Sequence, residues 1–467
     1  MEVEDFHGNN LASTHSWRTP EVSMSRRSSR SLAALVLFAA ALAAVPGASA
    51  PAPAAKSGLA ATEQRLVARV DARREGAVEL LRRAVDQPSA TENLDGVRKT
   101  GAIFAAELAG LGFATRWIEL PAEAGRAGHL VAEYHGGGRS VAGARILMIG
   151  HLDTVLEGER FRREGDRAFG SGVSDMKGGD VVIVEALRAL AGEGLLAGRQ
   201  VIVVLTGDEE DAGEPHSVSR AALLAAARES DIALAFEGAV PGVAVVGRRG
   251  FASWRLETSG STGHSARIFG PDRGDGAIFE MARILTAFRG ELPEPYLTFN
   301  PSVVVGGTTA EIPAGTAAGS ATGKHNVVAA RTVVEGDLRF LTAEQRDLAE
   351  VRMRAIVARS SPQSGGTIAF FHGMPSMAPT AGNRALLAAL DRVSRDLGTG
   401  AIVEQDPNER GAGDISFVAD LLPGLDGLGA LGEQEHARGE YVDLAELPRL
   451  VQRAALLLHR LGKTPAP

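Results

Sequence analysis

The amino-acid sequence predicts an α/β fold in which a domain with a mainly parallel sheet is interrupted by a small inserted α+β domain. Short apolar runs alternate with helical patterns in the first half of the chain, at 130–134, 146–149, 201–205 and 232–236. Runs of this length that alternate with helices are typical of buried parallel strands. From about residue 248 the pattern changes to alternating apolar and polar residues, which is typical of half-exposed strands. The two patterns predict two different sheets.

Helical periodicity locates the helices that accompany these strands. In the larger domain we expect helices at 62–85, 94–111, 180–191 and 219–227, and after the insert at 385–396 and 443–461. In the insert, strands and helices are expected at 251–258, 277–288, 333–340, 343–358 and 367–371. The order strand, helix, strand, helix, strand is typical of a compact α+β unit.

These patterns divide the chain into four segments. They are an N-terminal extension with a signal peptide over 1–50, the first part of the larger domain over 51–247, the insert over 248–374, and the second part of the larger domain over 375–467. In open parallel sheets, ligands bind at the carboxyl ends of the strands. Polar clusters begin where the predicted strands of the larger domain end, so the functional site is expected there.

Residues 24–50 have the features of a secretory signal. Three arginines precede an apolar run at 32–45, and the small residues at 47–50 resemble a cleavage site. The run is too short for a comfortable membrane span, and an uncleaved N-terminal anchor is the alternative. We therefore expect translation to start at Met24, and the mature protein to be periplasmic or secreted with no membrane span after cleavage.

Charge and composition exclude several classes of function. The net charge is −8, so the chain lacks the basic field that nucleic-acid binding requires. It contains no cysteine, which excludes disulfides, thiolate nucleophiles and cysteine-type zinc sites. Any metal must therefore be bound by histidine, aspartate and glutamate.

The first polar clusters provide such ligands. The strand at 146–149 runs into His151 and Asp153, which project to the same side of an extended segment. His151 can bind a metal while Asp153 supports its ring, and a hydrogen-bonded core histidine is the alternative. Asp175 lies among glycines just before a helix, where it either approaches a ligand or caps the helix.

Acidic side chains follow the next two strands. The strand at 201–205 is followed by four consecutive carboxylates over 208–211, which are costly beside a buried strand unless cations neutralise them or water surrounds the loop. The strand at 232–236 ends in Glu237, and His436 lies far downstream. Together with the earlier clusters, these groups suit two zinc ions bound without thiolates. A pair of metals needs a shared carboxylate, and the aspartate between glycines is well placed to provide it.

In this order, the motifs resemble the co-catalytic zinc peptidases of the glutamate carboxypeptidase, succinyl-diaminopimelate desuccinylase and aminoacylase type. The resemblance is carried by His-Leu-Asp-Thr-Val at 151–155, Gly-Val-Ser-Asp-Met-Lys-Gly-Gly at 172–179 and Asp-Glu-Glu at 208–210. It covers nearly the whole mature chain in motif order. The chain looks most similar to the glutamate carboxypeptidase branch.

The resemblance implies a ligand set for two zinc ions. It places His436 and Glu210 on one zinc and His151 and Glu237 on the other, with Asp175 bridging the two. Cobalt is a substitute metal.

Further roles follow from the same resemblance. Glu209 is expected to act as the general base, and Asp153 to support the ring of His151. The peptide bond between Asp175 and Met176 is expected to be cis.

The insert resembles the lid and dimerisation domain of the same family. Its segment Gly-Ser-Thr-Gly-His-Ser implies that His264 reaches the active site of the partner subunit, so we expect a homodimer. Asn326 and Arg339 match a pair that binds the carboxylate of the substrate. Ala329 stands where the family usually has proline, which leaves the substrate preference open.

The implied activity is that of a carboxypeptidase-like exopeptidase. Water activated by the two zinc ions would hydrolyse an amide bond next to a free carboxylate, in a small peptide or an N-acyl amino acid. Two alternatives remain. An N-acyl-amino-acid deacylase (an aminoacylase) is poorly separated from a carboxypeptidase by sequence alone. A non-catalytic periplasmic binding protein is disfavoured, because no ligand and no base is missing.

Overall fold

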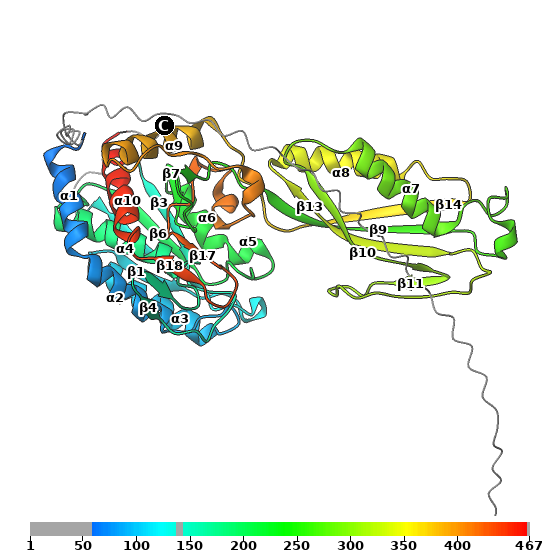
Figure 1. Ribbon diagram of the computed structural model, residues 1–467, viewed down its shortest axis with the longest axis horizontal. Coiled ribbons are helices and arrows are strands. Elements are labelled where there is room, and N and C mark those ends of the chain that lie inside the picture. The colour runs from blue at the N-terminus through cyan, green and yellow to red at the C-terminus, as the bar shows by residue number, and fades with distance from the viewer. Residues whose placement is uncertain (1–57, 137–142, 465–467) are drawn as a thin grey trace, which may run out of the picture. The chain divides into compact units, whose positions relative to one another are not determined.

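The computed structural model describes residues 58–136 and 143–464 (Figure 1). The N-terminal extension and signal peptide expected over 1–50 lie outside the described residues. Within the two described ranges, no helix is long and apolar enough to cross a membrane.

The larger domain is built on a six-stranded sheet with the order β1-β2-β6-β3-β7-β16. The strands are β1 (Ala114–Ile118), β2 (His129–His135), β6 (Gln200–Thr206), β3 (Ile146–His151), β7 (Ile232–Ala235) and β16 (Gly424–Leu425). From β6 to β16 all neighbouring strands are parallel, and β2 and β1 extend the sheet in antiparallel pairing. The predicted α/β fold with a mainly parallel sheet is confirmed.

Helices cover both faces of this sheet, which explains the continuous apolar runs of its strands. In β3, Ile146 and Met148 belong to the core on one face, and Leu147 and Ile149 belong to the core on the other. The first core is closed by α1 (Ala61–Ala72), α2 (Arg74–Val85), α3 (Leu94–Ala109), α4 (Lys177–Gly192), α9 (Ala381–Asp396) and α10 (Leu447–Leu461). The second is closed by α6 (Ala221–Arg228) and the 3-10 helix η5 (Asp414–Val418).

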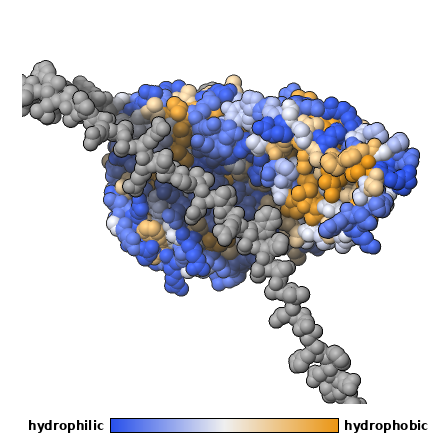
Figure 2. Space-filling view, turned by 45° about the vertical axis from the view of Figure 1, so that its right-hand side comes forward, coloured by the Kyte–Doolittle hydropathy of each residue, from blue (hydrophilic) through white to orange (hydrophobic). Residues whose placement is uncertain are grey.

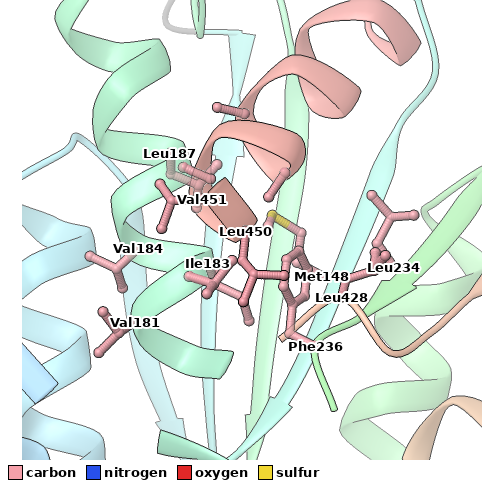
Figure 3. Packing of buried hydrophobic residues seen from close by; sticks show 14 of the residues in the cluster. Met148, Val181, Ile183, Val184, Leu187, Leu234, Phe236, Leu428, Leu450 and Val451 are labelled. Atoms are coloured by element: carbon pink, nitrogen blue, oxygen red, sulfur yellow. The ribbon is translucent and has the colours of Figure 1, made fainter. Parts of the chain in front are cut away.

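The first core fixes the elements that carry the polar clusters. Figure 3 shows Met148 of β3 and Leu234 of β7 close to Ile183 and Leu187 of α4 and to Leu450 of α10. All five side chains are almost completely shielded from water. Because strands and helix share one dense core, the carboxyl ends of the strands and the start of α4 are held in a fixed relation.

The insert forms a separate four-stranded antiparallel sheet with the order β10-β13-β9-β14 (Figure 1). Its strands are β10 (Thr298–Gly307), β13 (Arg331–Phe340), β9 (Gly250–Gly260) and β14 (Ser364–His372). The helices α7 (Gly276–Glu291) and α8 (Ala343–Val357) share an apolar core with this sheet. A hairpin of β11 (Thr309–Glu311) and β12 (Ser320–Thr322) lies beside β10. The segment boundaries stay a prediction.

Short elements complete the larger domain. A second sheet has the order β17-β18-β5-β4, with β17 (Gly432–Glu433), β18 (Tyr441–Asp443), β5 (Arg167–Phe169) and β4 (Arg162–Glu164). The strands β8 (Val243–Ala244) and β15 (Val403–Glu404) pair in parallel. The remaining helices in the described part of the chain are α5 (His216–Ser219), η1 (Ala122–Ala124), η3 (Ser265–Arg267) and η4 (Pro407–Glu409).

The first and the last predicted helices have different limits in the structure. The helix expected at 62–85 is two helices, because Arg73 leaves the helical conformation with φ −102° and ψ 1°. The helix expected at 443–461 begins only at Leu447, with a proline in its first turn, where proline costs no hydrogen bond. The preceding residues pair as β18 with β5 instead.

Candidate metal centre

The ends of three neighbouring parallel strands bring the predicted residues to one edge of the sheet. β3 ends at His151, the loop after β6 contains Glu209 and Glu210, and Glu237 follows β7. Asp175 lies two residues before α4. This is the edge at which open parallel sheets bind ligands.

His436 comes from a different part of the chain. It lies in the connection between β17 and β18, where its φ is +61°. Gln434 and Gly439 of the same connection also have positive φ values. This short, tightly turned connection extends to the sheet edge and completes the cluster.

Two groups of side chains have the geometry of metal sites. His151, Asp175 and Glu237 form one group, and Asp175, Glu210 and His436 form the other, with candidate ligand atoms within 4.8 Å of one another in each group. His151 Nε2 lies 3.1 Å from Asp175 Oδ1 and 3.9 Å from Glu237 Oε1. His436 Nε2 lies 3.0 Å from Asp175 Oδ2 and 3.2 Å from Glu210 Oε2. The two oxygens of Asp175 therefore face the two groups.

The alternative role of Asp175 as a helix cap is wrong. The residue at the cap position of α4 is Met176, and no side chain caps this helix. The carboxylate of Asp175 is occupied by the two imidazoles instead. The peptide bond between Asp175 and Met176 is cis, as expected from the resemblance.

The donor set fits a pair of divalent cations. Imidazole and carboxylate are ligands that zinc accepts without thiolates. Glu210 Oε1 is buried and has no hydrogen-bond partner in the described part of the chain. A buried oxygen without a partner is rare in proteins, and a cation would satisfy it. Carboxylates this close together also repel one another unless positive charge lies between them.

Burial and mutual repulsion shift the pKa values in the cluster. Burial, reinforced by the charge of Asp175, raises the pKa of Glu237 to about 8. Hydrogen bonds to Asp175 and Glu210 raise the pKa of His436 to about 11. Burial and the charge of Glu237 raise the pKa of Glu209 well above its ordinary value. The protein alone thus retains protons where bound cations would displace them.

Asp153 holds the loop after β6 as well as His151. Its buried carboxylate accepts hydrogen bonds from Thr91 Oγ1 at 2.7 Å and from the main-chain N–H groups of Glu209 and Glu210 at 3.0 and 3.1 Å. His151 Nδ1 lies 3.0 Å from the main-chain oxygen of Asp153 and 3.5 Å from its Oδ1. One carboxylate therefore orients both the imidazole and the acidic loop.

The first carboxylate of the acidic run points away from the cluster. Asp208 is fully buried and accepts hydrogen bonds from Gly213 N–H at 2.9 Å, from Ser219 Oγ at 2.7 Å and from the guanidinium of Arg220 at 2.5 Å. Arg220 is also fully buried, and its Nε lies 2.7 Å from Asp414 Oδ1. This ion-pair network could not be predicted from the sequence, because a charged residue in a sequence carries no sign of its burial.

Replacing Arg220 by methionine should lower the free energy of unfolding by about 3–5 kcal/mol, because two buried carboxylates lose their counter-charge. Chemical denaturation measures the effect. Arg228→Met is the matched control, since Arg228 is exposed at the end of the neighbouring helix α6 and its replacement should cost no more than about 0.5 kcal/mol. Equal losses for the two variants would contradict the role of the network.

The three predicted residues of the insert lie outside the cluster. His264 is exposed, pairs with Val327 in a β-bridge, and lies beside Asn326, whose main-chain oxygen accepts the N–H of Ser265. Among the described residues, no hydrogen bond or ion pair links His264, Asn326 or Arg339 to the five clustered side chains. The structure of a single chain does not bring these residues to the metal centre.

Arg339 lies on β13 and already has partners on its own sheet. Its Nε lies 2.9 Å from Asp337 Oδ2, and its guanidinium lies 4.6 Å above the ring of Phe251. The side chain is about one-third exposed. A planar guanidinium held in this way keeps N–H groups available for a carboxylate.

A cavity of about 190 Å³ adjoins the second ligand group. Asp175, Glu210 and His436 form one side of it, and Val155 and Leu156 contribute an apolar wall. Both apolar side chains are exposed. Apolar walls with a few convergent polar groups are typical of small-molecule binding sites.

The fold and the centre agree with the comparisons with known proteins. The sequence model of peptidase family M20/M25/M40 matches residues 147–460, and the chain belongs to this family. It is thus a hydrolase of a metallopeptidase family, and the predicted family and enzyme class are confirmed.

Individual relatives carry more specific names than the family. Carboxypeptidase G2 of Pseudomonas sp. (strain RS-16) is 26% identical over 400 residues, which cover 82% of this chain and 89% of the relative. A succinyl-diaminopimelate desuccinylase of Gluconobacter oxydans (strain 621H) is 26% identical over 329 residues, which cover 66% of this chain and 79% of the relative.

Solved structures with the same fold include two bacterial peptidases. The aminopeptidase PepT from Bacillus cereus ATCC 10987 matches with a TM-score of 0.65 and 17% identity, covering 83% of this chain and 98% of that one. The YXEP protein of Bacillus subtilis, described as a dinuclear metal binding peptidase from the M20 family, matches with a TM-score of 0.58 and 16% identity, covering 84% of this chain and 99% of that one. These likenesses show the fold.

Proposed function

We propose that this chain is a zinc-dependent exopeptidase of the carboxypeptidase type, which hydrolyses an amide bond next to a free carboxylate. The observation that supports it most is the shared carboxylate of Asp175, whose two oxygens lie 3.1 and 3.0 Å from His151 and His436. One carboxylate between two imidazole groups fits a pair of metals better than a single ion. The relative named carboxypeptidase G2 supports the carboxypeptidase type.

The metal pair is assigned to the two ligand groups. His151, Asp175 and Glu237 would hold one ion, and Asp175, Glu210 and His436 the other. When bound, zinc polarises the substrate carbonyl and lowers the pKa of water toward neutrality.

Glu209 is the general base and acid of the reaction. It directly precedes Glu210 in the loop that Asp153 fixes through two main-chain N–H groups. Its carboxylate takes the proton of the attacking water and later donates it to the leaving amine. A carboxylate whose pKa is raised by burial is suited to both transfers.

The insert supplies the groups that bind the rest of the substrate. Arg339 binds the free carboxylate through two parallel N–H donors, with Asn326 beside it. His264 donates a hydrogen bond to the oxyanion that forms during attack on the amide. Since His264 lies outside the cluster of its own chain, it acts on the active site of the partner in a homodimer.

A panel of substrates tests the proposed activity. Dipeptides with a free C-terminal carboxylate should be hydrolysed, and the same peptides with an amidated C-terminus should lose most of their kcat/KM. Equal rates for the free and amidated peptides would contradict the exopeptidase assignment.

The second candidate is an N-acyl-amino-acid deacylase. The similarity to relatives named succinyl-diaminopimelate desuccinylase favours it, because that name denotes removal of a succinyl group, which is an acyl group. Release rates from matched dipeptides and N-acetyl amino acids would separate the two activities. A preference for the acetylated compounds would favour the second candidate.

Exposed apolar side chains on the insert support the homodimer. They include Phe269, Ile278, Phe279, Val304, Leu348 and Val351. Figure 2 shows apolar residues gathered on the right-hand part of the visible face. Apolar side chains that gather on a surface are typical of protein interfaces.

Mixing two inactive variants tests the dimer. Glu209→Gln and His264→Ala should each be almost inactive alone. In a refolded or co-expressed equimolar mixture, about one site in four combines an intact Glu209 with an intact His264 of the partner, so activity should recover to about a quarter of wild type. Absence of recovery in a mixture that forms mixed dimers would contradict catalysis across the interface.

We also propose that residues 24–50 direct export to the periplasm or the medium. The basic, apolar and small-residue regions of this segment support the proposal. N-terminal sequencing of the exported protein should find a start near residue 51. A protein retained inside the cell with residues 24–50 intact would contradict it.

A further inference from the structure

We propose that Glu440 is a positioning residue that joins the connection carrying His436 to the loop carrying Asp175, and thereby controls the metal position formed by Asp175, Glu210 and His436. The inference rests on the proposed function, because it requires a metal pair at this centre. Glu440 is not among the predicted ligands. Its carboxylate binds main-chain N–H groups of the loop that carries Asp175.

The side chain of Glu440 accepts hydrogen bonds from three main-chain N–H groups of that loop. Glu440 is buried, with 5% of its surface exposed. Its Oε1 accepts the main-chain N–H groups of Ser174 at 2.7 Å and Asp175 at 2.9 Å, and its Oε2 accepts that of Gly172 at 2.7 Å. The main-chain oxygen of Glu440 also accepts the N–H of Gly170 at 3.2 Å. Both ends of the glycine-rich loop are thus held by one residue.

These hydrogen bonds hold the main chain of Asp175, from which its carboxylate projects. The residues at 170–175 belong to no helix or strand. Of their N–H groups, only that of Val173 bonds within the loop, to the main-chain oxygen of Gly170 at 3.2 Å, so the others depend on partners outside it. Gly172 has a φ of +71°, which glycine adopts without steric cost. Bonds from N–H groups to an ionised carboxylate are among the stronger hydrogen bonds in proteins. Glu440 therefore fixes the backbone from which Asp175 projects.

The same residue fixes the position of His436. β17 and β18 pair through Gly432 with Val442 and through Glu433 with Tyr441, so the residues between them form a closed connection. Glu440 stands at the last position of this connection. When its carboxylate is bound to the loop of Asp175, the connection is held against that loop, and His436 Nε2 lies 3.0 Å from Asp175 Oδ2.

The two metal positions depend on Glu440 to different degrees. In the position with His151 and Glu237, the two ligands that are not shared with the other position come from the ends of β3 and β7, which the sheet holds rigidly. In the other position, His436 comes from the connection that Glu440 anchors. Loss of the anchor should therefore weaken the position of His436 more than that of His151.

Replacement of Glu440 by glutamine tests the inference without removing the side chain. The amide can still accept N–H groups through its oxygen, but its NH₂ group would face an N–H donor of the loop. Titration of the metal-free protein with zinc, followed by calorimetry, and with cobalt, followed by its visible absorption, should show two ions in wild type. In the Glu440→Gln variant we expect affinity for one ion to fall by about 10–100-fold, with the other changed much less.

Two further variants identify the position and exclude general loosening. His436→Ala should remove the same ion, so its cobalt spectrum should match that of Glu440→Gln at one equivalent. Glu159→Gln is the matched control, because Glu159 Oε2 accepts the N–H of Gly439 at 3.0 Å in the same connection. Its side chain does not bind the loop of Asp175, so two ions should remain. Thermal unfolding of the metal-free proteins checks that all variants fold.

The outcomes separate this inference from the proposed function. Unchanged affinities in Glu440→Gln, or an equal loss at both positions, would overturn the role of Glu440. A wild-type protein that binds two ions and hydrolyses peptides while Glu440→Gln behaves normally would leave the proposed function intact. A wild-type protein that binds fewer than two ions would overturn the proposed function itself.

Discussion

Replacement of Glu209 by glutamine should lower kcat by about 10²–10⁴-fold, the usual contribution of a general base, while two metal ions stay bound. Glutamine keeps the size of the side chain but cannot take a proton from water. The main-chain N–H that Asp153 accepts is present in both residues, so the loop should keep its place. Because the base acts in the transition state, KM should change far less than kcat.

The measurement combines steady-state kinetics with metal analysis of the same sample. Asp211→Asn is a suitable control, since Asp211 belongs to the same acidic run but pairs with Arg126 at the surface. It should retain nearly full turnover. If Glu209→Gln turned over substrate at the wild-type rate with both ions bound, another group would have to move the proton.

Removal of metal should abolish activity, and addition of zinc should restore it. The chelated protein should also unfold at a lower temperature, because the carboxylates of Asp175, Glu210 and Glu237 then face one another without cations. At a free metal concentration a thousandfold above Kd, binding stabilises the folded chain by about 4 kcal/mol.

Activity, metal content and thermal unfolding should be followed together during this experiment. A chelator already saturated with zinc serves as the control and should leave the protein active. Turnover that persists when analysis finds no metal would refute the metal assignment altogether.

The sequence predicted the parts of the centre that lie at strand ends. β3 and β7 are buried on both faces, so their apolar runs are visible in the sequence; His151 is the last residue of β3, and Glu237 lies two residues after β7. β10 could not be predicted in this way, because all of its residues are at least partly exposed and its apolar run is only the three valines at 303–305. Strands of two or three residues such as β17 and β18 are too short for any periodicity.

Distances between remote residues could not be predicted from periodicity. Asp175 could equally have been a helix cap, and only the fold shows that its two oxygens face two imidazoles. The acidic run at 208–211 offered four candidates of one kind, and the structure separates Asp208, which binds buried Arg220, from Glu210 beside His436. The ligand set was available from the sequence through resemblance, and its roles stay predictions until tested.

The distance along the chain between Asp175 and the residues that complete its site has a consequence for folding order. His436 follows Asp175 by 261 residues, and Glu440 follows it by 265. Contacts of such long range form late, because a large loop must close before they contribute. During synthesis, the strands of the six-stranded sheet and α4 are made before the connection between β17 and β18 exists. A growing chain therefore has no second metal position, and hydrolytic competence arises only when this last connection docks.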